Sequence, residues 1–268
     1  MKKIVALLLT LVMAVGLLAA CGGQAKTAKV INIELTEEQY AFGVDKDQPE
    51  LLEKANTFIA QIKEDGTLEE IFDKYFGEGT PEGVKSAEYD AGKDQLVVAT
   101  NAEFAPFEYM EGDTFYGVDM ELVINHMDFD AVCLAVGEHK ADIAMAGLTI
   151  NEDRKKHVEF TESYYDACQK LIVLSDNTEF DNCKTAADVE AILNAKDANY
   201  KIGVQNGTTA QFYSAGDEDW GFAGFPVTTT GYKNGSLAVS DLINGGLDAV
   251  IIDAAPAEKI VEQINKLQ

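Results

Sequence analysis

Four short polar stretches hold the side chains with the clearest capacity for chemistry. Arg154 ends AGLTINEDR, GTT at 207–209 follows one apolar run, Asp253 ends another, and NAEFAPFEY begins at Asn101. A guanidinium is a planar, charged fork that suits a carboxylate, and the free N–H groups of a helix start at 207–209 favour an anion. An ionised carboxylate at the end of an apolar strand is costly unless a cation pairs with it. These residues predict a site for a small molecule that carries both an anionic and a cationic group.

The elements that must position these residues alternate between strand and helix. Apolar runs predict strands, and helical spacing of apolar residues predicts helices. We expect strands at 95–100, 142–146, 170–174, 200–204 and 247–252, and helices at 51–62, 67–77, 186–194, 236–244 and 256–266. Thr67 and Glu70 form a capping-box pattern for the second helix. This alternation predicts an α/β protein with mostly parallel sheets, in which ligands bind at the carboxyl ends of the strands.

Each residue also has a simpler structural interpretation. Asp253 could cap the helix that follows it, and Thr208 could be an ordinary N-cap. Arg154 could pair with a neighbouring acid at a surface turn. Phe104 and Phe129 could be ordinary core residues. The binding interpretation therefore depends on all of these residues occurring together.

Five motifs resemble one known family: TNAEFAPFEY, MDFDAV, AGLTINEDRKK, GVQNGTT and VIIDAAPAE. They are similar to motifs of the polar amino-acid branch of bacterial extracellular solute-binding proteins, the receptors of ABC importers. The resemblance covers nearly the whole chain behind the export signal, in altered order. It implies a two-lobed, periplasmic-binding-protein-like fold of type 2. Each lobe would be a mostly parallel sheet flanked by helices, with a hinge between the lobes.

The resemblance also implies how an amino acid would be held. Its carboxylate would lie on Arg154, Thr149 and Thr209, and its ammonium on Asp253 and the carbonyl of Gly147. Phe104 and Phe129 would flank its side chain, with Ile252 and two amides facing the tip. The predicted ligand-binding residues are Asn101, Phe104, Phe129, Gly147, Thr149, Arg154, Gln205, Thr208, Thr209 and Asp253. Because the two amides, Asn101 and Gln205, are uncharged, a neutral polar ligand such as glutamine or cystine is weakly preferred.

The order of the segments departs from the family pattern. ELTEEQYAFGV and the helical pair behind it resemble the family's C-terminal part, yet they lie near the N-terminus. The resemblance therefore implies a circular permutation. In this interpretation residues 28–170 form the large lobe, from the permuted segment 28–77, a linker 78–93 and the segment 94–170, and residues 175–268 form the small lobe. We expect a single covalent crossing near 171–175, with the strand near 30–34 docking noncovalently.

A second departure follows Leu122. Only VINH separates Leu122 from Met127, about a dozen residues fewer than the helix and strand of the family, and parallel strands usually need a crossover of that size. The first helix of the large lobe is therefore expected to be missing. Its loss would uncover one face of the sheet or leave a cavity beside Phe104.

The N-terminus predicts export. Lys2 and Lys3 precede an apolar run, and LAAC ending at Cys21 resembles a bacterial lipobox. We expect a signal peptide at 1–20, lipid on Cys21 and a tether over 21–27, which would anchor the protein to the outer face of the cytoplasmic membrane. A transmembrane anchor is the alternative, but the run is shorter than the roughly 20 residues that a span prefers.

Composition narrows the classes of partner. The formal charge of −25 argues against nucleic acid and anionic membrane surfaces as partners. Cys133, Cys168 and Cys183 lack metal-type spacing, and the sequence cannot choose a disulfide pair among them. The three histidines are scattered, so no metal site and no cofactor is predicted.

The expected function is capture of a free polar amino acid by a monomeric, noncatalytic receptor, which delivers it to an ABC permease with its cytoplasmic ATPase. A lyase or dehydratase on the same fold is one alternative, with Glu103 and Glu108 as acid/base candidates that lack a recognisable partner motif. A sensory or degenerate paralogue without a transport role is the other.

Overall fold

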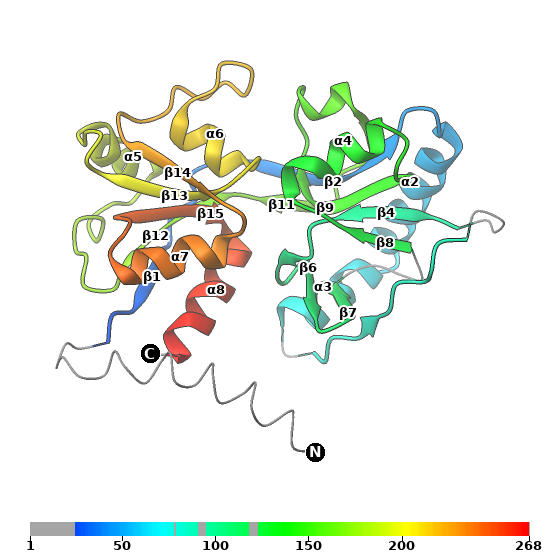
Figure 1. Cartoon of the computed structure of the whole chain (residues 1–268), viewed down its shortest axis with the longest axis horizontal. Helices are drawn as coiled ribbons and strands as arrows, with labels where there is room; N and C mark the ends of the chain where they lie inside the picture. The colour runs from blue at the N-terminus through cyan, green and yellow to red at the C-terminus, as the bar shows by residue number, and fades with distance from the viewer. Residues whose placement is uncertain (1–24, 78, 91–94, 118–122, 268) are drawn as a thin grey trace.

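The structure is a computed structural model that describes residues 25–77, 79–90, 95–117 and 123–267. These residues form two lobes that lie side by side, each built on its own β-sheet (Figure 1). The expected signal peptide and Cys21 lie outside the described residues. Within the described part of the chain, no helix combines the length and the apolar character needed to cross a membrane.

One lobe holds a five-stranded sheet with helices on both faces (Figure 1). Its strands, in spatial order, are β1 (Ala28–Ile31), β12 (Gln169–Leu174), β15 (Ala249–Asp253), β13 (Lys201–Gln205) and β14 (Thr228–Tyr232). α5 (Ala186–Asn194) and α6 (Thr209–Ala215) pack on one face, and α7 (Gly235–Asn244) and α8 (Ala254–Lys266) pack on the other. This lobe places Asp253 and the turn after Gln205 at the carboxyl ends of two neighbouring strands.

The other lobe holds a six-stranded sheet. Its order is β10 (Val158–Phe160), β2 (Glu38–Asp45), β9 (Ile143–Thr149), β4 (Val97–Thr100) and β8 (Val123–His126), with β11 (Tyr165–Ala167) also paired to β2. The 3-10 turn η1 (Phe129–Ala131) and α4 (Val132–Gly137) pack on one face. Leu51 and Leu52 of α2 (Pro49–Glu64) pack on the other, and α3 (Thr67–Phe76) follows α2. A second 3-10 turn, η2 (Arg154–Lys156), follows β9.

Both sheets are mixed, whereas the sequence predicted mostly parallel ones. β13 runs parallel to β14 and β15, and β4 runs parallel to β8 and β9. β1 pairs antiparallel with β12, and β2 pairs antiparallel with β9 and β10. The N-terminal strands therefore introduce much of the antiparallel pairing, because they enter sheets whose parallel strands come from later in the chain.

Local sequence explains the helix ends, with one correction. Pro49 opens α2, where its missing N–H costs nothing. The N-cap of α3 is Gly66, in the left-handed conformation, and Asp65 accepts a hydrogen bond from the Thr67 backbone N–H at 3.0 Å. The capping box predicted for Thr67 and Glu70 is therefore wrong. A capping box does occur between Thr185 and Asp188 at the start of α5.

The chain passes between the sheets twice. It leaves β1 for β2 through residues 32–37, and it returns from β11 to β12 through Cys168. This differs from the single crossing expected near 171–175 and from the lobe boundary at 170. The physical reason is the antiparallel register of Ala28–Ile31 with Leu171–Leu174, which makes β1 part of the five-stranded sheet.

The first residue of β1 is held by the last helix. The Asn265 side chain accepts from the Ala28 backbone N–H at 2.9 Å and donates to the Ala28 carbonyl at 2.8 Å. Thr27 adds a hydroxyl contact to Ser175 at 2.8 Å. Thr27, which lies within the segment predicted as tether, is therefore in contact with the five-stranded lobe.

The crossover from β4 to β8 contains no helix among its described residues. It is built instead from β5 (Glu103–Phe104), β6 (Glu108–Glu111) and β7 (Thr114–Gly117), which form a small sheet with β3 (Gly83–Val84) from the predicted linker. Residues 118–122, which precede the expected gap, lie outside the described residues. VINH forms β8, in parallel register with β4. A cavity of about 550 Å³ lies beside Phe104, between the lobes.

The three described cysteines, Cys133, Cys168 and Cys183, are free thiols. Near the end of β2, the carboxylates of Asp45 and Asp47 and the ring of His139 bring three potential ligand atoms within 4.8 Å of one another. His139 Nδ1 lies 2.6 Å from Asp45 Oδ2, and this pairing raises the pKa of His139. The group joins the turn before α2 to the turn after α4 and lies at the opposite end of β2 from Glu38.

Candidate binding site between the lobes

Arg154 is the positively charged end of the candidate site. η2 begins at Arg154, and Asn151 fixes its start by accepting from the Arg154 backbone N–H at 2.8 Å. The guanidinium is buried, and its Nη1 donates to the Thr149 carbonyl at 2.8 Å. Burial lowers the pKa of Arg154, and the nearby carboxylates of Glu38 and Asp253 oppose this effect. A buried, permanently charged fork of this kind is suited to a carboxylate.

Two aromatic rings enclose the guanidinium. The Arg154 carbon lies 5.2 Å from the ring centroid of Phe129 and 5.2 Å from that of Trp220. Trp220 also stacks on Phe212 at 4.4 Å. Phe129 was predicted to flank a ligand side chain, and here it packs against Arg154. Trp220 was not predicted, because it lies in an irregular loop without a motif.

The second lobe meets Arg154 directly. Arg154 Nη2 donates to the Gly207 carbonyl at 3.1 Å, and the hydroxyl of Thr209 donates to that of Thr149 at 3.2 Å. Gly207 has φ +74°, a conformation that favours glycine. The Thr208 hydroxyl donates to the Gln205 carbonyl at 2.8 Å, so this side chain closes the turn between β13 and α6. Thr149, Arg154 and Thr209 are therefore brought together as predicted, whereas Thr208 supports the turn.

Asp253 is the negatively charged end of the candidate site, together with a second carboxylate that the sequence did not reveal. Gln169 Nε2 donates to Asp253 Oδ1 and to Glu38 Oε1, at 2.9 Å in each case. Tyr40 also donates to Asp253 through its hydroxyl. Burial and the nearby Glu38 carboxylate raise the pKa of Asp253 to about 7. An ionised Asp253 is thus costly here without a cation.

Glu38 links the two ends of the site. Its Oε2 accepts from the Thr149 hydroxyl at 2.6 Å, and its Oε1 accepts from Thr36 at 2.6 Å as well as from Gln169. Sequence reasoning missed Glu38, Tyr40 and Gln169. The two residues of β2 stand in ELTEEQYAFGV, a stretch noted only for its position in the chain. Gln169 carried no motif, and its position beside Asp253 depends on the pairing of β12 with β15.

A third part of the site holds the predicted amides. Asn101 donates to the Met127 carbonyl at 2.7 Å, and Gln205 donates through Nε2 to the Asn101 side-chain carbonyl at 3.1 Å. Gln205 is 1% exposed, and its Oε1 has no hydrogen-bond partner among the described residues. The structure therefore brings Asn101 and Gln205 together from opposite lobes and leaves one buried acceptor.

Phe104 and Gly147 pack together next to this part. Gly147 has φ +53°, and a Cβ at this position would lie 3.0 Å from the Phe104 ring. Phe104 is 3% exposed and stacks on Phe107 at 5.9 Å between centroids. Ile252, expected near the tip, lies in the same hydrophobic cluster. The core interpretation of Phe104 thus applies in this structure, and Gly147 is required for close packing.

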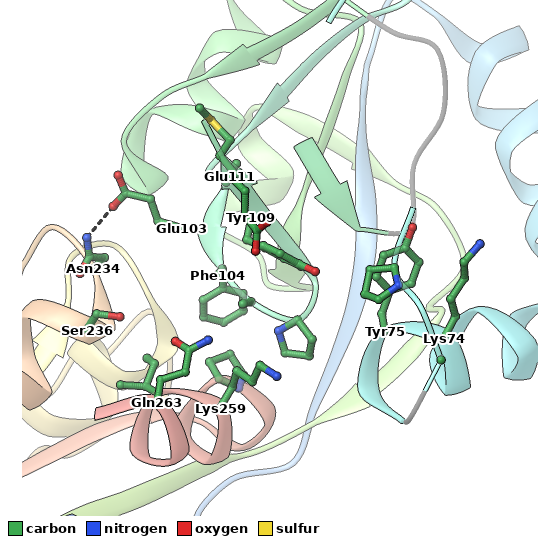
Figure 2. A pocket seen from close by; sticks show the side chains of 18 of the residues that line it. Lys74, Tyr75, Glu103, Phe104, Tyr109, Glu111, Asn234, Ser236, Lys259 and Gln263 are labelled. Carbon is green, nitrogen blue, oxygen red and sulfur yellow. Dashed lines mark hydrogen bonds between the residues drawn. The ribbon is translucent and has the colours of Figure 1, made fainter. Parts of the chain in front are cut away.

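Polar contacts close the rim of the site. Asn234 donates to the Glu103 carboxylate at 2.6 Å (Figure 2), and Lys233 lies 3.2 Å from the Asp128 carboxylate. Beyond Phe104, the cavity of about 550 Å³ continues between Lys74 and Tyr75 on one side and Lys259 and Gln263 on the other (Figure 2). Each rim contact joins the two lobes, so the structure is a closed arrangement.

The fold and the site define a class of protein: a two-lobed α/β protein with buried charged residues where its lobes meet. The chain matches the model of bacterial extracellular solute-binding proteins, family 3, over residues 7–78 and 96–262. It belongs to that family, as the sequence motifs implied, and the two-lobed periplasmic-binding-protein-like fold expected from them is confirmed.

Similar proteins have names that refer to basic amino acids. An arginine-binding extracellular protein of Bacillus subtilis is 28% identical over 202 residues, which cover 69% of this chain and 71% of the relative. A probable histidine-binding protein of Neisseria gonorrhoeae is 30% identical over 174 residues, which cover 59% of this chain and 58% of that protein. The match thus spans less than two thirds of the second relative.

Two solved structures are similar to the chain. The arginine-bound form of a truncated ArgBP from T. maritima has a TM-score of 0.50 and 29% identity, over 63% of this chain and 77% of that one. An ancestral arginine-binding protein bound to glutamine has a TM-score of 0.50 and 30% identity, over 63% of this chain and 73% of that one.

Proposed function

We propose that this protein is the substrate-binding component of an amino-acid ABC importer. The observation that carries the proposal is the pair of Arg154 and Asp253, which are buried on opposite lobes and connected by hydrogen bonds through Thr149, Glu38 and Gln169. An α-amino acid presents a carboxylate and an ammonium group, and these are the two charges that this pair would neutralise. The names of the similar proteins support an amino acid as ligand.

Closure of the two lobes would couple ligand binding to a change in the conformation of the protein. The Gly207 carbonyl contacts Arg154 Nη2 at 3.1 Å, so a ligand carboxylate would replace a main-chain oxygen on the guanidinium. Thr149 and Thr209 would then hold the same group from the two lobes, and Asp253 would hold the ammonium. A ligand that binds both lobes favours the closed form over the open form, because it gains contacts only on closure.

The remaining parts of the proposal concern location and partners. Residues 1–20 would direct export, and lipid on Cys21 would tether the receptor at the outer face of the bacterial cytoplasmic membrane. The closed receptor, acting as a monomer, would deliver its amino acid to a membrane permease driven by an ATPase. The membership of an extracellular family supports export.

Thermal unfolding tests the central claim. The protein without residues 1–21 would be heated with and without each common amino acid and cystine at millimolar concentration. A ligand present at 100 times its dissociation constant adds about 2.7 kcal/mol to the free energy of unfolding, which raises the melting temperature by several degrees. A selective rise supports the receptor. A cooperative transition that no amino acid moves rejects it and favours the sensory or degenerate alternative.

An enzyme on the same fold is the less favoured alternative. Glu103, the acid/base candidate at the rim, accepts from Asn234 and lies 3.7 Å from His126 Nε2. The similar proteins described above are named for binding. Incubation with each amino acid that shifts the transition, followed by product analysis, separates the two functions, because a receptor returns its ligand unchanged.

We also propose that the chain is a circular permutant of the family. Two observations support this: the family model matches two separate segments, and the α8 residue Asn265 bonds both backbone groups of Ala28 in β1. Joining the C-terminus to Lys26 and opening the chain within 79–90 would restore the order implied by the resemblance. We expect the rejoined protein to fold with the same ligand selectivity. Failure to fold would contradict the permutation.

A further inference from the structure

The buried charges of the site do not balance. Three ionisable side chains that are each less than a tenth exposed meet here: Arg154 at 7%, Glu38 at 9% and Asp253 at 5%. With all three ionised, one positive charge faces two negative charges. Because interactions between buried charges are weakly screened, this surplus acts on any ligand that the lobes enclose.

The hydrogen-bond partners of Glu38, the carboxylate in excess, are neutral groups. Glu38 accepts from Thr36, Thr149 and Gln169, none of which carries a charge. In the described parts of the chain, neither Glu38 nor Asp253 lies within 4.0 Å of a Lys, Arg or His nitrogen. Gln169 donates one Nε2 group to both carboxylates, which holds them close together. The protein therefore keeps a second buried acid at the negatively charged end without supplying its counter-ion.

The part of the site near the amides also accepts hydrogen bonds. Gln205 Oε1 is a buried acceptor without a partner among the described residues, and it lies beside the Asn101 side chain. The Glu103 carboxylate at the rim is held by Asn234. A ligand side chain that donates hydrogen bonds would satisfy the Gln205 oxygen, whereas an acceptor such as a carboxylate would not.

We propose that the ligand is an amino acid with a cationic side chain, and that Glu38 is the residue that sets this preference. The proposal rests on the proposed receptor function. Ligand carboxylate balances Arg154, and ligand ammonium balances Asp253. Glu38 then remains, and only a third ligand charge, on the side chain, balances it. The sequence favoured a neutral ligand because the two amides, Asn101 and Gln205, carry no charge. The proposal differs because the acid that would pair with a cationic side chain, Glu38, lies on β2 and not beside those amides.

Arginine and citrulline provide a matched pair of probes, since citrulline keeps the shape of arginine but replaces its guanidinium with a neutral group. Isothermal titration calorimetry would measure both affinities for the native protein and for Glu38→Gln. We expect the native protein to bind arginine at least about ten times more tightly than citrulline. Glu38→Gln should reduce that ratio to less than about three, mainly by weakening arginine.

Glu37→Gln is the control, because it removes the same charge from the neighbouring, exposed residue. We expect it to leave the ratio unchanged. Equal affinity of the native protein for arginine and citrulline would overturn the proposal, even if Glu38→Gln failed to fold. A Glu38→Gln protein that folds and keeps the native ratio would overturn it as well. If the native protein binds other free amino acids but neither probe, the proposed preference for a cationic side chain is wrong, while the proposed receptor function still holds. Failure to bind any amino acid would reject the proposed function itself.

Discussion

The two ends of the cleft are built in different ways. Arg154 is a single charge, held within its own lobe by Thr149 and Asn151 and enclosed by rings. The negatively charged end has two carboxylates, Glu38 from β2 and Asp253 from β15, which share Gln169 across the two sheets. Both ends receive contacts from both lobes, including Gly207 and Trp220 at Arg154, but one end holds a single charge and the other holds two charges of the same sign. Loss of a charge should therefore be more severe at the Arg154 end, where no second group of the same sign is close by.

The largest effect is expected for Arg154→Ala. It removes the only buried cation of the site among the described residues and leaves Glu38 and Asp253 without a counter-charge. Affinity for the amino acid should fall at least about 30-fold, because truncation of a buried charged partner costs roughly 2–5 kcal/mol. Calorimetric titration measures the loss. Lys155→Ala, beside it but exposed and paired with Glu152, is the matched control and should bind normally.

A smaller loss is expected for Asp253→Asn. Asparagine keeps the size of Asp253, and the raised pKa of Asp253, about 7, means that its negative charge is already only partly formed near neutral pH. Affinity should therefore fall only about tenfold, which corresponds to about 1.4 kcal/mol. The same titration measures it. Equal losses for Asp253→Asn and Arg154→Ala would show that both ends contribute alike to affinity, and the contrast between the two ends would disappear.

The crowding of Glu38 and Asp253 should also appear in the stability of the ligand-free protein. The pKa of Asp253 is raised in the folded state to about 7, so the folded protein holds a proton there that the unfolded chain has released. This site therefore makes the protein less stable as the pH rises from about 4 to about 7, by at most about 1.4 kcal/mol per pH unit. Above pH 7 the contribution stays constant.

Chemical unfolding of the native protein and of Asp253→Asn across this pH range isolates the contribution. The difference in free energy of unfolding between native protein and variant should decline with rising pH. Carboxylates that do not interact with Asp253 contribute equally to both proteins and cancel. A difference that is independent of pH would show that Asp253 titrates normally.

The smallest effect is expected for Trp220→Leu, which removes one ring from Arg154 but keeps its charge and its hydrogen bonds. A contact between a cation and a ring contributes about 0.5–1 kcal/mol, so affinity should fall about two- to fivefold. Because Trp220 is the only tryptophan of the chain, its fluorescence in the native protein reports the same contact. Emission that does not change on ligand addition would contradict a ligand-dependent arrangement around Arg154.

Sequence reasoning recovered the local parts of the molecule. The helices at 186–194 and 236–244 and the strands that end at Gln205 and Asp253 follow from nearby periodicity and turns. Arg154 and Thr149 were found because five residues of one loop place them together. These predictions required only the chemistry of short segments.

The parts that were missed depend on pairing between distant segments. Glu38, Gln169 and Asp253 are far apart in sequence and meet through the register of β12 with β15 and the approach of β2. The mixed character of the sheets and the membership of β1 in the five-stranded sheet have the same origin. The periodicity of apolar residues within one segment does not predict which distant strand will pair with it.

The double contact between Ala28 and Asn265 has a mechanical consequence. Tension that reaches the fold from the N-terminal side acts first on Thr27 and Ala28, which are held by Ser175, by the pairing of β1 with β12 and by the Asn265 side chain. β12 and α8 belong to the same lobe as β1. In the anchored form that we propose, tension from the anchor therefore acts on the five-stranded lobe. The six-stranded lobe is the one that moves when the receptor opens and closes.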